Sequence, residues 1–144
     1  VDSFNASVIL GGLDSVLTRM QQIRDMGNEA SPKDNAEYLV YEVAYEMYAR
    51  GYEFLPAKLG ASKATKFSVE DGKVRIPFRA LEGIGENAAK SFAAAYDERE
   101  FSSVEDVLLR TSMNKSNIAT LREHGVIAGL PESDQFDIFS ISIS

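Results

Sequence analysis

The stretch Ala80-Leu-Glu-Gly-Ile-Gly-Glu-Asn-Ala-Ala-Lys-Ser-Phe-Ala-Ala-Ala95 contains the pattern that decides the fold of this 144-residue chain. It predicts the end of one short helix, a tight turn at Gly83-Ile84-Gly85, and a second helix that begins near Glu86. Glycine accepts a positive φ and allows a foreign backbone to come close, while Ile84 between the two glycines can insert into the core and hold the turn.

The helix that starts at this turn offers a place for a phosphate group. Its first N–H groups have no helical acceptors, and the macrodipole is positive at that end, so a phosphate oxygen could bind to the backbone alone. The full spacing, with Leu81 before the glycines and Ala89 and Phe92 after them, resembles the helix-hairpin-helix motif of proteins that bind DNA independently of sequence. The alternative is a connection between two helices that binds no ligand.

The composition is that of a globular chain with unevenly distributed charge. Hydrophobic residues make up 44% of the sequence, which is enough for a core, and no apolar run approaches the length of a transmembrane helix. The net charge of −7 argues against a general nucleic-acid binder. Residues 56–94, however, carry seven basic and four acidic side chains, a local charge of +3. A chain that meets DNA through one face is compatible with this distribution.

Residues suited to catalysis or metal binding are few. Cysteine is absent, and His124 is the only histidine, which we expect to cap carbonyl groups at the end of the last helix. The sequence shows no paired carboxylates at a site-like spacing, no metal-ligand cluster and no nucleophile beside a base. We therefore expect no catalytic residue, metal or cofactor in this chain. No stretch resembles a signal peptide, and a reducing cytoplasm is the expected location.

Two helices are expected in the N-terminal third. The first runs from Asn5 or Ser7 to about Met26, and Gly11-Gly12 weakens it by about 1 kcal/mol per glycine relative to alanine. The second covers about residues 35–50. Tyrosines recur along it at a spacing of three and four: Tyr38, Tyr41, Tyr45 and Tyr48. Such a stripe can stack on bases, but it more often packs with its hydroxyls at the rim, and packing is the interpretation that we favour.

A β-hairpin is expected in the middle of the chain. Residues 66–70 and 73–77 alternate with a period of two and are joined by Asp71-Gly72, a pair typical of a type I′ turn. Lys73 and Arg75 share one face of the second strand. These cations either border a phosphate track or form a solvated strand face, and the sequence leaves both interpretations open.

The residues after the hairpin are expected to be helical again. Helices are expected from Glu86 to about Asp97, over residues 104–110, and from Asn114 to a stop at Gly125. With its glycine-containing turn and apolar plug, this half could be a degenerate second copy of the motif. The expected fold class is therefore α+β and mostly helical, with an N-terminal helical pair, a small β-hairpin and a tandem helix-hairpin-helix domain.

The tail over residues 131–144 has an apolar centre, Gln135-Phe136-Asp137-Ile138-Phe139. The aliphatic and aromatic side chains could fill a pocket on a partner while the Gln135 amide bonds to its backbone. Each buried apolar side chain is worth about 1.5–3 kcal/mol, offset by the cost of ordering the peptide. The alternative is a frayed terminus.

Four stretches together resemble the C-terminal region of the bacterial DNA polymerase III alpha subunit of the PolC type. They are Lys58-Leu59 with Ser62–Phe67, Ile76–Ser91, Glu100–Asp106 and Gly129–Phe139. The resemblance implies that residues 1–51 close the fingers region and that residues 52–130 form a duplex-DNA-binding domain with tandem helix-hairpin-helix elements. Residues 131–144 would be a flexible tail with a sliding-clamp-binding peptide.

The resemblance also implies which residues form the sites. The family's phosphate-contacting turn falls on five residues with one nearby cation: Gly83, Ile84, Gly85, Asn87, Ala88 and Lys90. Its clamp-binding peptide falls on Gln135, Ile138 and Phe139, with Ile138 in place of the usual leucine. Together with Lys73 and Arg75 from the hairpin, these are the expected binding residues.

The expected partners are thus double-stranded DNA and the sliding clamp, and no membrane. The catalytic acids of such a polymerase, with the Mg²⁺ that they hold, belong to the palm, and no residue here matches them. The role implied for this chain is positional: it holds nascent duplex and ties it to the clamp. The alternatives are a helix-hairpin-helix module of a DNA-repair or ligase protein, and a helical interaction domain that binds no nucleic acid.

Overall fold

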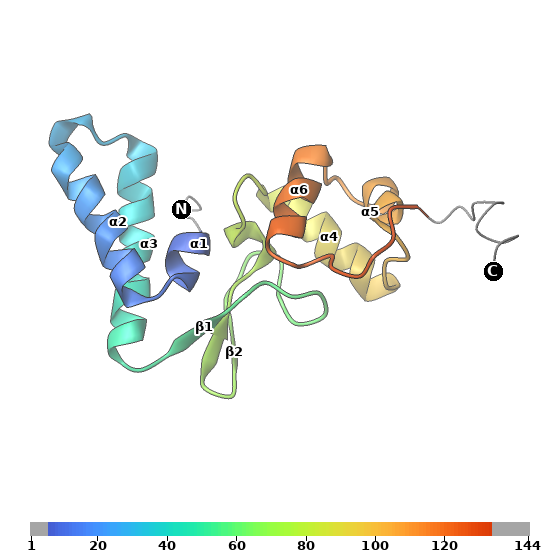
Figure 1. Ribbon diagram of the computed structural model, residues 1–144, viewed down its shortest axis with the longest axis horizontal. Coiled ribbons are helices and arrows are strands. Elements are labelled where there is room, and N and C mark those ends of the chain that lie inside the picture. Colours follow the sequence, from blue (N-terminus) through green and yellow to red (C-terminus); the bar gives the residue numbers. More distant parts are fainter. Residues whose placement is uncertain (1–5, 134–144) are drawn as a thin grey trace, which may run out of the picture.

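The computed structural model describes residues 6–133 and has three regions in chain order. Helices α1 to α3 lie at one end of the molecule, helices α4 to α6 lie toward the other end, and a three-stranded sheet lies between them (Figure 1). This arrangement confirms the expected α+β, mostly helical fold.

The first expected helix is in fact two helices, α1 (Ala6–Leu10) and α2 (Leu13–Met26), so the prediction of one continuous helix is wrong. The chain leaves the helical path at Gly12, where φ is 99°, a value that glycine adopts at little cost. A side chain at Gly11 would clash with Ser15, since an added Cβ would lie 2.7 Å from its hydroxyl oxygen. The break folds α1 back so that Ile9 is fully buried against α2 and α3.

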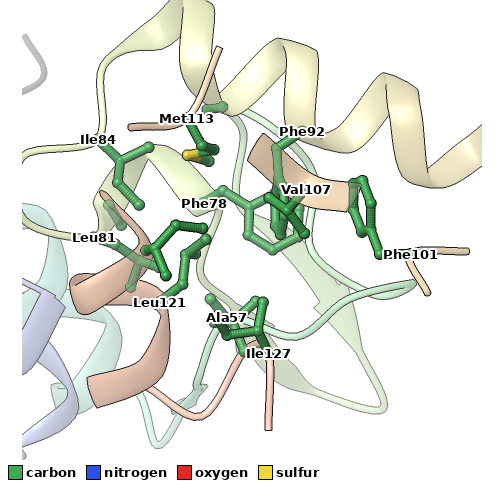
Figure 2. Close-up of a cluster of buried hydrophobic side chains, with 14 of the residues drawn as sticks. Ala57, Phe78, Leu81, Ile84, Phe92, Phe101, Val107, Met113, Leu121 and Ile127 are labelled. Atoms are coloured by element: carbon green, nitrogen blue, oxygen red, sulfur yellow. The ribbon is translucent and has the colours of Figure 1, made fainter. Parts of the chain in front are cut away.

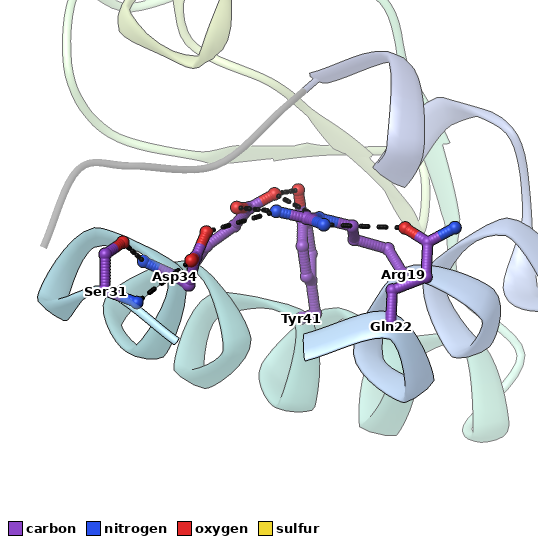
Figure 3. Close-up of polar contacts among 6 residues, drawn as sticks. Arg19, Gln22, Ser31, Asp34 and Tyr41 are labelled. Atoms are coloured by element: carbon purple, nitrogen blue, oxygen red, sulfur yellow. Dashed lines mark hydrogen bonds and ion pairs between the residues drawn. The ribbon is translucent and has the colours of Figure 1, made fainter. Parts of the chain in front are cut away.

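Helix α3 (Pro32–Ala49) follows a short 3₁₀ turn, η1 (Gly27–Glu29). It begins slightly before the expected residue 35, with Ser31 as its N-cap and Pro32 as its first residue. The Ser31 hydroxyl accepts from the Asp34 N–H, and the Asp34 carboxylate accepts from the Ser31 N–H, both at 3.0 Å. Arg19 of α2 then donates to Glu37 at 3.0 Å and to Asp34 at 3.3 Å (Figure 3). The helix start and the α2–α3 contact are therefore parts of one polar network.

Three of the four tyrosines of α3 pack, as expected, whereas Tyr45 is 41% exposed. Tyr41 is fully buried, and its hydroxyl donates to Glu37. The Tyr48 hydroxyl donates to the Ile9 carbonyl at 2.5 Å, and the Tyr38 hydroxyl accepts from Arg24 at 2.7 Å. These hydroxyls tie α3 to α1 and α2.

The sheet consists of β1 (Glu53–Leu55), β2 (Ser68–Glu70) and β3 (Lys73–Arg75) in the order β1-β3-β2. Strands β2 and β3 are antiparallel and joined by Asp71-Gly72, whose φ values of 50° and 78° confirm the type I′ turn. The strands are shorter than the expected 66–70 and 73–77. The parallel pairing of β1 with β3 was not predicted, and it joins the two ends of the molecule because Phe54 packs against both cores.

The larger core lies beneath η2 (Phe78–Ala80), α4 (Glu86–Glu98), α5 (Val104–Arg110) and α6 (Lys115–Glu123). The segment before the glycine turn is thus a single 3₁₀ turn rather than the end of an α-helix. Aromatic rings form the centre of this core (Figure 2). The ring of Phe92 packs edge-on against Phe78 and stacks on Phe101, with centroid distances of 4.9 and 5.1 Å.

Candidate nucleic-acid interface

The Gly83–Gly85 turn connects η2 to α4 and is anchored by its middle residue. Ile84 is 4% exposed and points into the core beside Leu81 (Figure 2). Its N–H donates to the Leu81 carbonyl at 3.1 Å. Gly83 has a φ of 76°, a conformation that disfavours residues with a Cβ, so the fold itself requires glycine there. The expected plug between the two glycines is confirmed.

Gly85 differs from Gly83, because the fold does not require a glycine at this position. Its φ of −79° and ψ of 173° suit most residues, and a Cβ added to it would meet no atom within 4 Å. The missing side chain therefore leaves the backbone bare toward open space. A phosphate group is a ligand that would use this close approach.

Helix α4, like α2, begins at a glycine and has no side-chain cap, in contrast to α3, α5 and α6. Helices α3, α5 and α6 begin at Ser31, Ser103 and Asn114, and each side chain accepts a hydrogen bond from the helix backbone. The residue at this position of α4 is Gly85, which has no side chain to accept one. The first helical bond of α4 is that of the Ala89 N–H to the Gly85 carbonyl at 3.0 Å. The N–H groups before it, including those of the predicted residues Asn87 and Ala88, face the N-terminal end of the helix.

A second turn, between α5 and α6, lies beside the first one. The Asn117 side-chain amide in α6 donates to the Gly83 carbonyl at 3.1 Å, and the Ser112 N–H donates to the Ser91 hydroxyl at 3.0 Å. Met113, two residues before α6, is buried as Ile84 is before α4. The helix-turn-helix that parallels the first one is therefore α5–α6, not the expected glycine-containing turn after α6, which no helix follows within residues 6–133. At the start of α6 the Asn114 side chain accepts a hydrogen bond from the Asn117 N–H, so that N–H is not open to a phosphate.

Charged groups surround the start of α4. The Glu86 carboxylate accepts from Arg79 at 2.7 Å through one oxygen and from Lys90 at 2.6 Å through the other. These bonds lower the pKa of Glu86 below its ordinary value, and the bond from Lys90 contributes most. Lys90, the cation expected beside the turn, is thus near it but engaged with a carboxylate.

A family model described as the helix-hairpin-helix motif matches residues 51–135, more than half of the chain. The chain belongs to the helix-hairpin-helix family. The match begins just before β1 and includes both turns described above.

This helix-hairpin-helix chain is also similar to much longer proteins. It is 40% identical to the DNA polymerase III PolC-type of Clostridium perfringens and 39% identical to that of Thermotoga maritima, in both cases over 138 residues or 96% of the chain. The protein of the same name from Listeria innocua is 34% identical over the same length. The chain spans about a tenth of the length of these curated relatives.

The two strand cations expected to meet DNA are not brought to the helix-hairpin-helix turn. The Lys73 ammonium nitrogen lies 3.3 Å from a carboxylate oxygen of Glu53 on the neighbouring strand. The Arg75 guanidinium donates to Glu70 at 2.7 and 2.9 Å and to the Pro56 carbonyl at 3.0 Å. In Figure 1 the tip of the β2–β3 hairpin points away from the helices, whereas the segment before α4 lies on the opposite side of the molecule.

The other sequence-based expectations fall outside the interface. Gln135, Ile138 and Phe139 lie outside the described residues, so the clamp-binding peptide stays a prediction. His124 occupies the C-cap position of α6, and its N–H donates to the Thr120 carbonyl at 3.1 Å. Within residues 6–133 no group of three potential metal ligands is found, and no helix there has the length and hydropathy needed to span a bilayer.

Two contacts at the helix-hairpin-helix turn were missed by sequence reasoning. Glu86 and Lys90 are four residues apart, a spacing that signals an ion pair on a helix, and this signal was available. The bond from Asn117 to Gly83 joins residues 34 positions apart, and no local pattern indicates it.

Proposed function

We propose that this chain binds double-stranded DNA without reading its sequence, as part of a PolC-type replicative DNA polymerase. The observation that carries the proposal is the uncapped start of α4 behind a turn whose second glycine leaves open space. The helix-hairpin-helix match over residues 51–135 supports DNA as the ligand.

The mechanism follows from the geometry of the turn. Backbone N–H groups at the start of α4 donate to phosphate oxygens, and the positive end of the helix macrodipole adds to the attraction. Ile84 fixes the turn from inside, so these donors are positioned before DNA arrives. Because phosphates are identical along the duplex, contacts of this kind give affinity without sequence preference.

The similarity to PolC-type polymerases supports a place within a replicative polymerase. It extends over 96% of the chain and so includes α2 and α3, which a helix-hairpin-helix module of a repair or ligase protein would not need to share. In this proposal the chain is the C-terminal part of the alpha subunit, and catalytic acids with Mg²⁺ lie elsewhere in the parent polymerase.

The tail would connect the polymerase to a sliding clamp. Gln135, Ile138 and Phe139 form the peptide that we propose to enter a pocket on the clamp. A tether of this kind makes rebinding to DNA intramolecular, so weak contacts at the turn are sufficient for processive synthesis.

Binding to two unrelated duplexes of equal length, followed by fluorescence anisotropy across a salt series, tests this function. We expect equal affinities for both sequences and a linear fall of log K with log salt, with a slope of about −0.9 for each phosphate contacted. Absence of binding at low salt, or a strong preference for one duplex, would contradict the proposal and favour an interaction domain without nucleic acid.

A further inference from the structure

Glu86 holds a position where an anion is unexpected in a phosphate-binding turn. It is the first residue of α4, next to Gly85, and its side chain is 45% exposed. One carboxylate oxygen accepts from Arg79 and the other from Lys90, at 2.7 and 2.6 Å. The carboxylate is thus paired with two cations beside the helix end that the phosphate would approach.

A phosphate arriving at this turn would compete with Glu86 on two counts. Both anions are attracted to the same positive helix end, and both are acceptors for the same guanidinium and ammonium groups. The exposed ion pairs of Glu86 are individually weak, so a phosphate can displace them at a cost. A glutamate carboxylate is charged at neutral pH, so Glu86 competes as an anion. The bond from Lys90, followed by the charges of Lys90 and Arg79, lowers the pKa of Glu86 further.

We propose that the Glu86 carboxylate competes with DNA phosphates for the start of α4 and its cations, and thereby lowers the affinity of the turn for duplex DNA. This inference rests on the proposed function, because it assumes that the turn contacts DNA. A low affinity suits a contact that must be broken and formed again at each step along the duplex. In the proposed function, the tether to the sliding clamp keeps the polymerase on the DNA meanwhile.

The test compares Glu86→Gln with Glu82→Gln by anisotropy on one duplex across a salt series. Glu82 is exposed, lies just before the same turn and forms no ion pair within residues 6–133, so its replacement makes the same charge change without releasing a cation. If Glu86→Gln lets one released cation reach a phosphate, the affinity rises about eightfold at 0.1 M salt and the salt slope steepens by about 0.9. Glu82→Gln is expected to change the affinity less than about twofold and to leave the salt slope unchanged.

A second variant ties the effect to the ion pair. The Lys90 side chain is 58% exposed, so Lys90→Met removes one of the two cations that Glu86 holds without disturbing the core. In this background we expect a smaller gain from Glu86→Gln than in the wild type, because only Arg79 remains to be released. Far-UV circular dichroism and urea unfolding of each variant verify that α4 is retained, because an acidic residue in the first turn favours the helix.

The outcomes separate the two proposals. If the wild type binds DNA with the expected salt dependence but Glu86→Gln and Glu82→Gln behave alike, the competition by Glu86 is refuted and the proposed function stands. If no variant, including Glu86→Gln, binds duplex at low salt, the proposed function itself fails.

Discussion

Gly85→Val is expected to lower the affinity for duplex DNA by at least tenfold, about 1.4 kcal/mol in binding free energy, while the chain stays folded. The φ and ψ of residue 85 suit valine, and the added side chain would extend into open space instead of the core. That space is where the proposed phosphate approaches the backbone. Anisotropy with a labelled duplex at low salt measures the change in affinity.

Two controls sharpen this result. Ala94→Val adds bulk at an exposed position two turns further along α4, and we expect it to leave DNA binding unchanged. Gly83→Val strains a residue with a φ of 76°, so it should cost about 1–2 kcal/mol of stability in addition to any effect on binding. Wild-type affinity in Gly85→Val would show that the bare backbone at this position has no role in binding.

Phe92→Ala is expected to lower the free energy of unfolding by about 3–5 kcal/mol. The ring is fully buried, packs edge-on against Phe78 and stacks on Phe101, so its removal leaves a cavity and ends both aromatic contacts. Because total stabilities of small domains are of the order of 5–15 kcal/mol, the variant should be close to unfolding. Urea titration followed by circular dichroism gives the difference.

Leu109→Ala provides the matched control for this truncation. Leu109 lies on α5 and is 77% exposed, so we expect a change of less than about 0.5 kcal/mol. A similar loss in both variants would mean that the aromatic cluster is not the centre of the core.

Features with a local cause were predictable from the sequence. The Asp71-Gly72 turn, the Ser31-Pro32 helix start and the Ile84 plug each depend on the conformational preferences of two or three adjacent residues. The burial of Phe92 follows from its spacing after the turn, which places it on the inner face of α4. Of these elements, Ile84 and Phe92 pack in the core beneath the Gly83–Gly85 turn and hold it against α4, which is why the family pattern is visible in the sequence.

Features that depend on distant partners were not predictable. The parallel pairing of β1 with β3 joins short segments about twenty residues apart, and neither shows a pattern that selects the other. The hairpin cations Lys73 and Arg75 were expected among the DNA-binding residues, but each forms an ion pair with a carboxylate in the fold. The break at Gly12 allows α1 to fold back and bury Ile9. This burial depends on distant residues, so the local helix propensity of the sequence did not indicate it.

The most direct measurement of the central claim is a titration of the ¹⁵N-labelled chain with a short duplex, followed through amide NMR shifts. We predict the largest changes at the N–H groups of residues 83–88, in the turn and the first residues of α4, with similar changes for unrelated duplex sequences. Changes concentrated at Lys73 and Arg75, or spread evenly over the surface, would contradict a phosphate site built from the backbone of this turn.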